Sequence, residues 1–305
     1  MKKEKLPTYF SILNRGKITL YIKKKYEEKL SEQEINKFIN LYEDTNELSA
    51  AHHGRAPCKR LSLNGLNGRN LVVRDYWHGG LFGKLLKNIF WENQRPLNEL
   101  SICETAIERG IKTTEIMAIV KNKIMGPLYK CKLVSMEISD AVDLMELLYD
   151  ENLILSQKRQ IITKLAEAIR KMHDAGIYHR DLHLKNILIQ KDNGLVKNAY
   201  IIDLDKSRQL KKIGLSKRMK NIMRLDRSLE KLIRNEPKTK SFKNINRLVT
   251  KTDRIRFFKE YIKSGSSSAQ HDSERFERPL KYYLQSLSTG HRLHKFWWSA
   301  MGNAK

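Results

Sequence analysis

The chain has 305 residues and a formal net charge of +25, from 59 basic and 34 acidic residues. No apolar run reaches the roughly 20 residues that cross a bilayer. Residues 1–7 are not followed by an apolar run of the kind found in a signal peptide. The three cysteines lie far apart, which excludes a disulfide framework or zinc ligand set and suits a reducing cytoplasm. The charge predicts a polyanionic partner: nucleic acid, an anionic membrane surface or a phosphorylated substrate.

The first third of the chain is expected to form an antiparallel sheet. Ser31–Glu34 is a capping-box pattern and predicts a short helix. Residues 47–76 have the pattern of a β-meander, with a hairpin turn at Asn64–Gly68 and a following strand at Leu71–Arg74.

The middle of the chain is expected to pass from strands to helices. A helix is predicted over Pro96–Arg109, and Leu133–Ile138 is expected to be an edge strand that runs into a hinge. Residues 140–149 should form a helix, and Ser156 should cap a longer one that stops at Gly176.

Two polar stretches carry the chemistry. The segment from His179 to Asn186 runs into an apolar strand, and a second apolar strand ends at Asp203. Asp181, the amide of Asn186 and the carboxylate of Asp203 can meet at one point after a hairpin. Their spacing matches the H-R-D-L-x-x-x-N loop of protein kinases. We therefore expect Asp181 to be the catalytic base, and Asn186 and Asp203 to hold Mg²⁺ against ATP phosphates.

The same comparison indicates a phosphate-binding cation in the first half. In kinases a basic residue on an N-terminal strand contacts the phosphates, and a glutamate on the next helix holds it. Arg74 and Glu99 are expected to fill these roles, although an ordinary hairpin with a surface arginine is the alternative for that segment alone. Gly54 and Arg55 are candidates for a phosphate-covering loop, on the basis of a two-residue motif.

The last third is strongly basic. Residues 206–263 contain 20 Lys or Arg and 5 Asp or Glu, which supply +15 of the net charge. Leu225, Leu229 and Leu232 give this stretch an apolar face, so a folded helix with a basic outside is expected. The tail 291–298 combines cations with two tryptophans. We favour a helix packed on its lobe, with contact to lipid headgroups as the alternative.

The chain resembles the lipopolysaccharide kinase (Kdo/WaaP) family, most closely its 3-deoxy-D-manno-octulosonic acid (Kdo) kinases. The most specific stretch is 71–85, which contains Tyr76 and Gly79-Gly80 and has no counterpart in protein kinases. The other stretches that carry the resemblance are Gly54-Arg55-Ala56, the spacing from Glu99 to Gly110, the strand end 201–206 and the late motif 221–229. Ala56 replaces a family glycine, which weakens the case for a phosphate cradle there.

The resemblance implies an α+β, protein-kinase-like fold of two lobes. Residues 1–137 would be an N-terminal lobe with an antiparallel sheet and one main helix, which binds nucleotide phosphates. Residues 138–305 would be a mostly helical C-terminal lobe with the catalytic loop, the metal site and a basic substrate-binding region. Arg224, Arg227 and neighbouring lysines are expected to form that substrate face.

The implied function is that of an enzyme, a phosphotransferase with an alcohol group as acceptor. It would use ATP and Mg²⁺ to phosphorylate a Kdo hydroxyl of a lipid A precursor during lipopolysaccharide core biosynthesis. Its partners would be a Kdo–lipid A type glycolipid and an anionic membrane surface, with the protein peripheral on the cytoplasmic face of the bacterial inner membrane. No nucleic acid partner is expected, because the basic stretch lacks interleaved aromatic residues.

Three alternatives stay open at this stage. A heptose kinase of the same wider family and a small atypical Ser/Thr protein kinase would share the catalytic loop. A catalytically silent kinase fold, used as a binding module, belongs to a different class. Intact Asp181, Asn186 and Asp203 argue against the silent form.

Overall fold

The protein divides into two compact units. The computed structural model describes residues 6–42, 49–52, 58–77, 88–91, 95–150, 152–234 and 249–265, with residues 281 and 285. Unit 1 comprises residues 1–108 and 113–139, and unit 2 comprises residues 109–112 and 140–305. The segment 109–112 joins unit 2, where the carbonyl of Lys112 accepts a hydrogen bond from the Ile201 amide (3.0 Å). The sequence analysis placed the boundary between residues 137 and 138, and so assigned the segment 109–112 to the N-terminal lobe.

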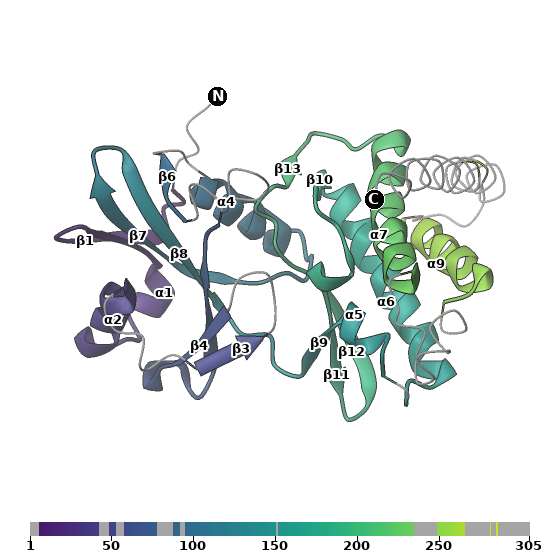
Figure 1. The fold of residues 1–305 in the computed structure, drawn as a ribbon, viewed down its shortest axis with the longest axis horizontal. Helices are drawn as coiled ribbons and strands as arrows, with labels where there is room; N and C mark the ends of the chain where they lie inside the picture. The colour runs from purple at the N-terminus through teal and green to yellow at the C-terminus, as the bar shows by residue number, and fades with distance from the viewer. Residues whose placement is uncertain are drawn as a thin grey trace, which may run out of the picture. The chain divides into compact units, whose positions relative to one another are not determined.

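Unit 1 is built on an antiparallel sheet that has eight strands among the described residues, in the order β1-β2-β7-β8-β5-β4-β3, with β6 paired to β8 (Figure 1). The strands are β1 (Phe10–Arg15), β2 (Ile18–Lys23), β3 (Ser49–His52), β4 (Cys58–Ser62), β5 (Asn70–Asp75), β6 (Phe90–Trp91), β7 (Ile116–Met125) and β8 (Leu128–Met136). The helices are α1 (Lys24–Glu27), α2 (Glu32–Ile39) and α4 (Arg95–Glu108), with short 3₁₀ turns η1 (Asn40–Tyr42) and η2 (Asn64–Leu66).

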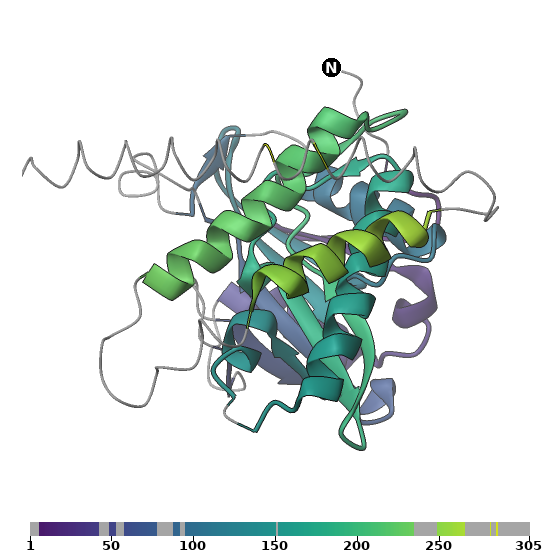
Figure 2. The same cartoon turned by 90° about the vertical axis from the view of Figure 1, so that its right-hand side faces the viewer.

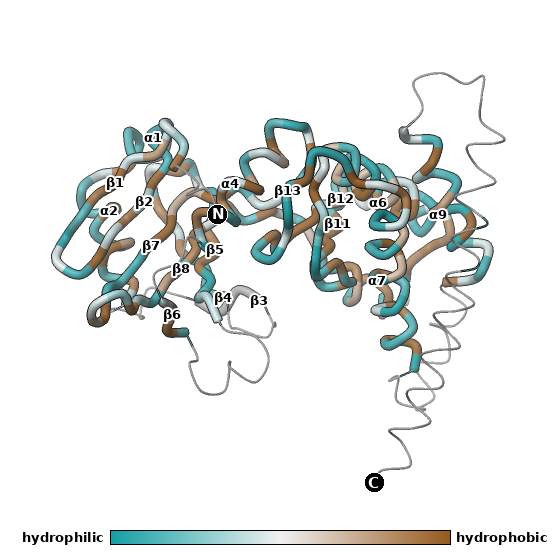
Figure 3. The backbone as a smooth tube through the Cα atoms, turned by 90° about the horizontal axis from the view of Figure 1, so that it is seen from above, coloured by the Kyte–Doolittle hydropathy of each residue, from teal (hydrophilic) through white to brown (hydrophobic). Residues whose placement is uncertain are grey.

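Strand β8 lies inside the sheet, so the expectation of an edge strand at Leu133–Ile138 is wrong. β8 pairs with β7 on one side and with β5 on the other. Its residues from Cys131 to Met136 are buried without alternation, as in a strand that is covered on both faces. Figure 3 shows the hydrophobic first half of the neighbouring strand β7.

Local sequence signals position the turns of unit 1. Ser31 caps α2, and its capping box with Glu34 is present as predicted. Glu34 also accepts a hydrogen bond from the amide of Gly65 (3.0 Å), which ties α2 to the turn between β4 and β5. A Cβ at Gly65 would lie 2.4 Å from the carbonyl oxygen of Lys29, so only glycine fits this close approach.

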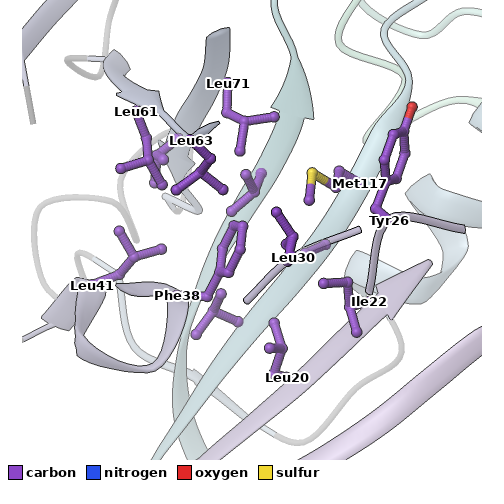
Figure 4. Close-up of a cluster of buried hydrophobic side chains, with 14 of the residues drawn as sticks. Leu20, Ile22, Tyr26, Leu30, Phe38, Leu41, Leu61, Leu63, Leu71 and Met117 are labelled. Atoms are coloured by element: carbon purple, nitrogen blue, oxygen red, sulfur yellow. The ribbon is translucent and has the colours of Figure 1, made fainter. Parts of the chain in front are cut away.

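The core of unit 1 lies between α2 with η1 and one face of the sheet. Phe38 of α2 packs with Leu20 and Ile22 of β2, and all three are fully buried (Figure 4). Leu61 and Leu71 pair across the β4–β5 hairpin and join the same cluster. The hairpin is therefore fixed to the core on its apolar side.

In its described residues, unit 2 is mainly helical and has two small sheets. Its helices are α5 (Leu144–Leu147), α6 (Leu155–Asp174), α7 (Leu215–Arg234) and α9 (Lys251–Lys263). Its strands are β9 (Ala141–Asp143), β11 (Ile187–Asp192) and β12 (Leu195–Ile201) in one sheet, and β10 (Ile177–Tyr178) with β13 (Arg208–Gln209) in the other. A short 3₁₀ turn, η3 (Leu184–Asn186), precedes β11.

Two helix predictions in unit 2 need correction. Asp140–Tyr149 is not one helix, because residues 141–143 pair with β11 and Asp143 then caps α5 by accepting from the Glu146 amide (2.8 Å). Ser156 does not cap α6: the N-cap is Ile154, without a side-chain cap. Ile154 is the N-cap because the helix begins one residue later, at Leu155, which is before Ser156.

The helices α6, α7 and α9 form the body of unit 2. In Figure 2, α7 (green) and α9 (yellow-green) lie beside one another, and Arg254 of α9 pairs with Asp226 of α7 at 2.8 Å. α6 carries a buried face that includes Ile161, Leu165 and Ile169. In the described part of the chain, no helix is both long and apolar enough to cross a membrane.

Candidate active site

The loop between β10 and β11 brings the predicted catalytic residues of unit 2 together. Asn186 is buried, and its Nδ2 donates to the backbone carbonyl of Asp181 (2.9 Å). Its own backbone amide donates to the carbonyl of His183 (3.0 Å). The side chain is thus held by its nitrogen, and Oδ1 is the atom that it can offer to a cation.

Asp203 reaches the same place from the end of β12. Ile187 is opposite Ile201 in the β11–β12 pair, and the Ile202 amide donates to the carbonyl of Asn186 (3.0 Å). Asp203 follows directly, with φ of 60°, a left-handed conformation that is uncommon for residues other than glycine. Such a conformation persists where the surroundings impose it, and it is frequent at functional sites.

His179 connects the catalytic loop to this strand end. The Asp181 amide donates to Nδ1 of His179 (3.2 Å), so the ring proton is on Nε2, which donates to the carbonyl of Ile202 (3.0 Å). Burial lowers the pKa of His179 and keeps the ring neutral. One imidazole therefore fixes the backbone of Asp181 relative to the residue that precedes Asp203.

Asn221 of α7 supports the loop from behind. Its Nδ2 donates to the carbonyl of His179 (2.6 Å), and its Oδ1 accepts from the His179 amide (3.3 Å). Nε2 of His173 lies 3.2 Å from the same oxygen, and Nδ1 of His173 lies 2.8 Å from the hydroxyl of Tyr261. Because this network is buried, desolvation lowers the pKa of His173 to about 3.

A second residue of α7 contacts the loop. The Ser228 hydroxyl accepts from the amide of Leu184 (3.3 Å), where the loop enters η3. Sequence reasoning gave no role to Ser228 or Asn221. The available signal was the late motif 221–229, which contains both residues.

Unit 1 forms the predicted pair of Arg74 and Glu99. Nη2 of Arg74 lies 2.7 Å from Oε1 of Glu99, whose side chain is 2% exposed. The hydroxyl of Tyr76 donates to the other carboxylate oxygen, a partner that sequence reasoning missed. The Arg74 guanidinium also lies over the Tyr76 ring, 5.4 Å from its centroid.

The second glutamate of α4 has a different task. Glu104 pairs with the buried Lys23 of β2 (2.8 Å) and accepts from the hydroxyl of Tyr9 (3.1 Å). It therefore fixes α4 to the sheet, and Glu99 is the carboxylate that meets Arg74. Gly54 and Arg55, the candidates for a phosphate-covering loop, lie outside the described residues.

The described residues contain no group of three or more His, Cys, Asp or Glu side chains that could hold a metal ion. Mg²⁺ commonly binds through one or two carboxylates together with phosphate oxygens and water.

An antiparallel sheet with a glutamate-bearing helix is a feature of the kinase class of phosphotransferases. So is a loop followed by a hairpin whose backbone contacts bring Asp181, Asn186 and the strand end before Asp203 together. The sequence model of the lipopolysaccharide kinase (Kdo/WaaP) family matches residues 50–261. The chain belongs to this family. The α+β, kinase-like fold predicted from the sequence is thereby confirmed.

Several curated relatives are Kdo kinases by name. The chain is 31% identical over 194 residues to the 3-deoxy-D-manno-octulosonic acid kinase of Vibrio parahaemolyticus, covering 62% of this chain and 76% of that protein. It is 32% identical over 186 residues to that of Haemophilus influenzae (strain PittGG), covering 59% and 74%. A match to the Vibrio cholerae protein has 34% identity over 164 residues and spans 52% of this chain and 65% of the relative.

Among solved structures, a similar chain is that of WaaP in complex with acyl carrier protein. The TM-score is 0.49 and the sequence identity 18%, with 74% of this chain and 82% of that chain covered.

Proposed function

We propose that the protein transfers the γ-phosphate of ATP to a hydroxyl of a Kdo sugar on a lipid A precursor. Support comes from the family, from the names of the relatives and from the grouping of Asp181, Asn186 and Asp203 in unit 2. The observation that carries the proposal is the side-chain anchor of Asn186 on the backbone of Asp181 (2.9 Å), next to the strand end that presents Asp203.

In this mechanism Asp181 orients the acceptor hydroxyl and accepts its proton as the new P–O bond forms. The bond between the γ-phosphorus and the bridging oxygen of ATP breaks, and ADP leaves with that oxygen. His179 contributes by holding the Asp181 backbone, since its neutral ring bridges Asp181 and Ile202. Catalysis then depends on positioning and on charge neutralisation.

Asn186 and Asp203 are the residues that would hold Mg²⁺. Amide and carboxylate oxygens suit this hard cation, and Asn186 already uses its nitrogen for the bond to Asp181. When bound, Mg²⁺ neutralises charge on the phosphates of the nucleotide. Arg74, held by Glu99 and Tyr76, contacts the nucleotide phosphates, where its fork can make two hydrogen bonds.

We also propose that the protein acts as a peripheral enzyme on the cytoplasmic face of the inner membrane. The net charge of +25 supports this, because an anionic leaflet attracts basic surfaces. The tail 291–298, with its two tryptophans, lies outside the described residues.

The test is phosphate transfer from γ-labelled ATP with Mg²⁺ to a Kdo-bearing lipid A precursor and to the same lipid without Kdo. Label on the Kdo-bearing lipid alone is expected. Asp181→Asn and Asp203→Asn should each lower kcat by at least about 10³-fold, since each removes a charge that the reaction uses. Asp192→Asn is the matched control, because Asp192 is an exposed carboxylate on β11 that pairs with Lys197. Transfer by either active-site variant at the control rate would refute the assignment of the residues. Equal label on the two lipids would show that Kdo is not the acceptor.

A further inference from the structure

Helix α7 carries a row of cations along one face. Members of the row are spaced alternately three and four residues apart, which places them on the same side of a helix. The row, called here the basic stripe, consists of Lys217, Lys220, Arg224, Arg227 and Lys231. The two acidic residues of α7, Asp226 and Glu230, both pair with Arg254 of α9. Both acidic side chains of the helix therefore bridge to α9, and Asp226 also acts on the neighbouring Arg227 as an attractive charge.

The two arginines of the stripe differ from its lysines in burial. Lys217, Lys220 and Lys231 are exposed, whereas Arg224 and Arg227 are half-buried. Extended lysines in water bind anions weakly and in many geometries. A half-buried guanidinium has fewer orientations and holds a planar fork of donors.

Arg224 lies between the two places where α7 contacts the catalytic loop. Asn221, three residues before it, holds the backbone of His179, and Ser228, four residues after it, accepts from the amide of Leu184. Positions 221, 224 and 228 share one side of a helix. Arg224 therefore stands beside the loop segment that contains Asp181.

One buried donor of this pair is left without a partner by the described part of the protein. Nη1 of Arg224 is buried without a hydrogen-bond partner there. The pKa of Arg227 is lowered, first by burial and then by the nearby charge of Arg224. Two guanidinium groups that repel each other, one with a buried N–H left unpaired, are costly until an anion joins them.

We propose that Arg224 and Arg227 form a binding site for the carboxylate of the acceptor sugar, next to the catalytic loop. This inference rests on the proposed function, because it takes an acidic sugar as the acceptor. The chemistry recognised is an oxyanion that accepts hydrogen bonds from two guanidinium groups. We favour the sugar carboxylate over a lipid phosphate because Arg224 stands beside the catalytic loop. An anion bound there belongs to the same sugar that presents its hydroxyl to Asp181.

The kinetic test compares a Kdo-bearing lipid A precursor with the same lipid after methyl esterification of its Kdo carboxylates. Wild-type protein should prefer the acid by about 10- to 100-fold in kcat/KM, the range for charge-assisted hydrogen bonds. Arg224→Lys and Arg227→Lys should lose most of this preference while KM for ATP stays the same. These variants keep the charge, so a general electrostatic effect would not produce the loss.

Two variants serve as controls. Lys220→Gln removes a cation from the basic stripe, and Lys259→Gln removes an exposed cation from α9. Both should retain the preference for the acid. An equal loss in Lys220→Gln would show that the stripe attracts anions only diffusely, and a full preference in both arginine variants would also overturn the site.

A binding experiment without ATP separates this inference from the proposed function. Calorimetry would measure free Kdo, its methyl ester and inorganic phosphate with wild-type protein and with Arg224→Lys. Binding of Kdo that is lost in the ester and in the variant supports the site even if wild-type protein transfers no phosphate. Binding of phosphate without Kdo would overturn the carboxylate assignment in favour of a phosphate site.

Discussion

Replacement of Asn221 by leucine is expected to weaken both the fold of unit 2 and catalysis. The side chain is fully buried and connects α7 to His179 through two hydrogen bonds, with His173 on the same oxygen. Leucine has a similar volume but no polar atoms. Three buried groups would therefore lose their partner: the amide and the carbonyl of His179, and Nε2 of His173.

The cost can be worked from these three groups. An unpaired buried donor or acceptor costs about 1–3 kcal/mol. Because leucine has no amide whose desolvation must be offset, we take the lower value, about 1 kcal/mol for each of the three groups. The free energy of unfolding should therefore fall by about 3 kcal/mol. The loop that carries Asp181 would also lose its support, and a displacement of about 1 Å at a reacting group lowers the rate by about 10²-fold.

The measurements are urea unfolding followed by circular dichroism, and kcat at saturating ATP and acceptor in conditions where the variant is folded. Asn198→Leu is the matched control: Asn198 is half-buried on β12, and its Nδ2 donates to Oε1 of Gln190 on the adjacent strand (2.9 Å). The reasoning fails if Asn221→Leu unfolds within about 0.5 kcal/mol of this control. It fails equally if kcat is unchanged, because the loop would then not depend on α7.

Two further predictions concern unit 1 and the pH dependence of stability. Glu99→Gln should raise KM for ATP by about 10-fold, since it weakens the charge-assisted hydrogen bond that holds Arg74. Tyr76→Phe removes a neutral donor to Glu99 and should raise KM less. Equal KM values in the wild type and both variants would exclude a role of Glu99 in positioning Arg74. The pKa of His173 falls from 6.5 to about 3 on folding. Between these two pH values the unfolded chain therefore binds more protons than the folded protein. The free energy of unfolding should decrease as the pH falls through this range, by up to about 1.4 kcal/mol per pH unit. His179 is shifted in the same direction, so His173→Gln should reduce the slope of a urea-midpoint series between pH 6.5 and 4 without removing it, and an unchanged slope would contradict the assignment.

The elements predicted well are those whose causes are local. The capping box at Ser31 and the hairpin turn after Ser62 depend on residues a few positions apart, and both are present. The pair of strands that joins Asn186 to Asp203 was also predictable, because two short apolar strands with a turn between them can pair in few ways.

Tertiary structure decided the features that depend on distant parts of the chain. The sequence suggested an edge strand at Leu133–Ile138, but the partners of β8 on both sides come from separate segments. The contacts of Tyr76 with Glu99 and of Asn221 with His179 join residues 23 and 42 positions apart. No periodic pattern indicates such contacts, since one hydrogen bond between remote residues leaves no repeat in the sequence.

The candidate site divides in the same way. The sequence by itself predicts which residues carry the chemistry, because Asp181, Asn186 and Asp203 have a spacing that few other structures require. Only the folded chain shows how Asp203 adopts a left-handed φ of 60° and how the nitrogen of Asn186 is fixed. It also places Arg224 beside the loop, between Asn221 and Ser228. These features arise from packing, which brings α7 and the loop together although they are far apart in the sequence.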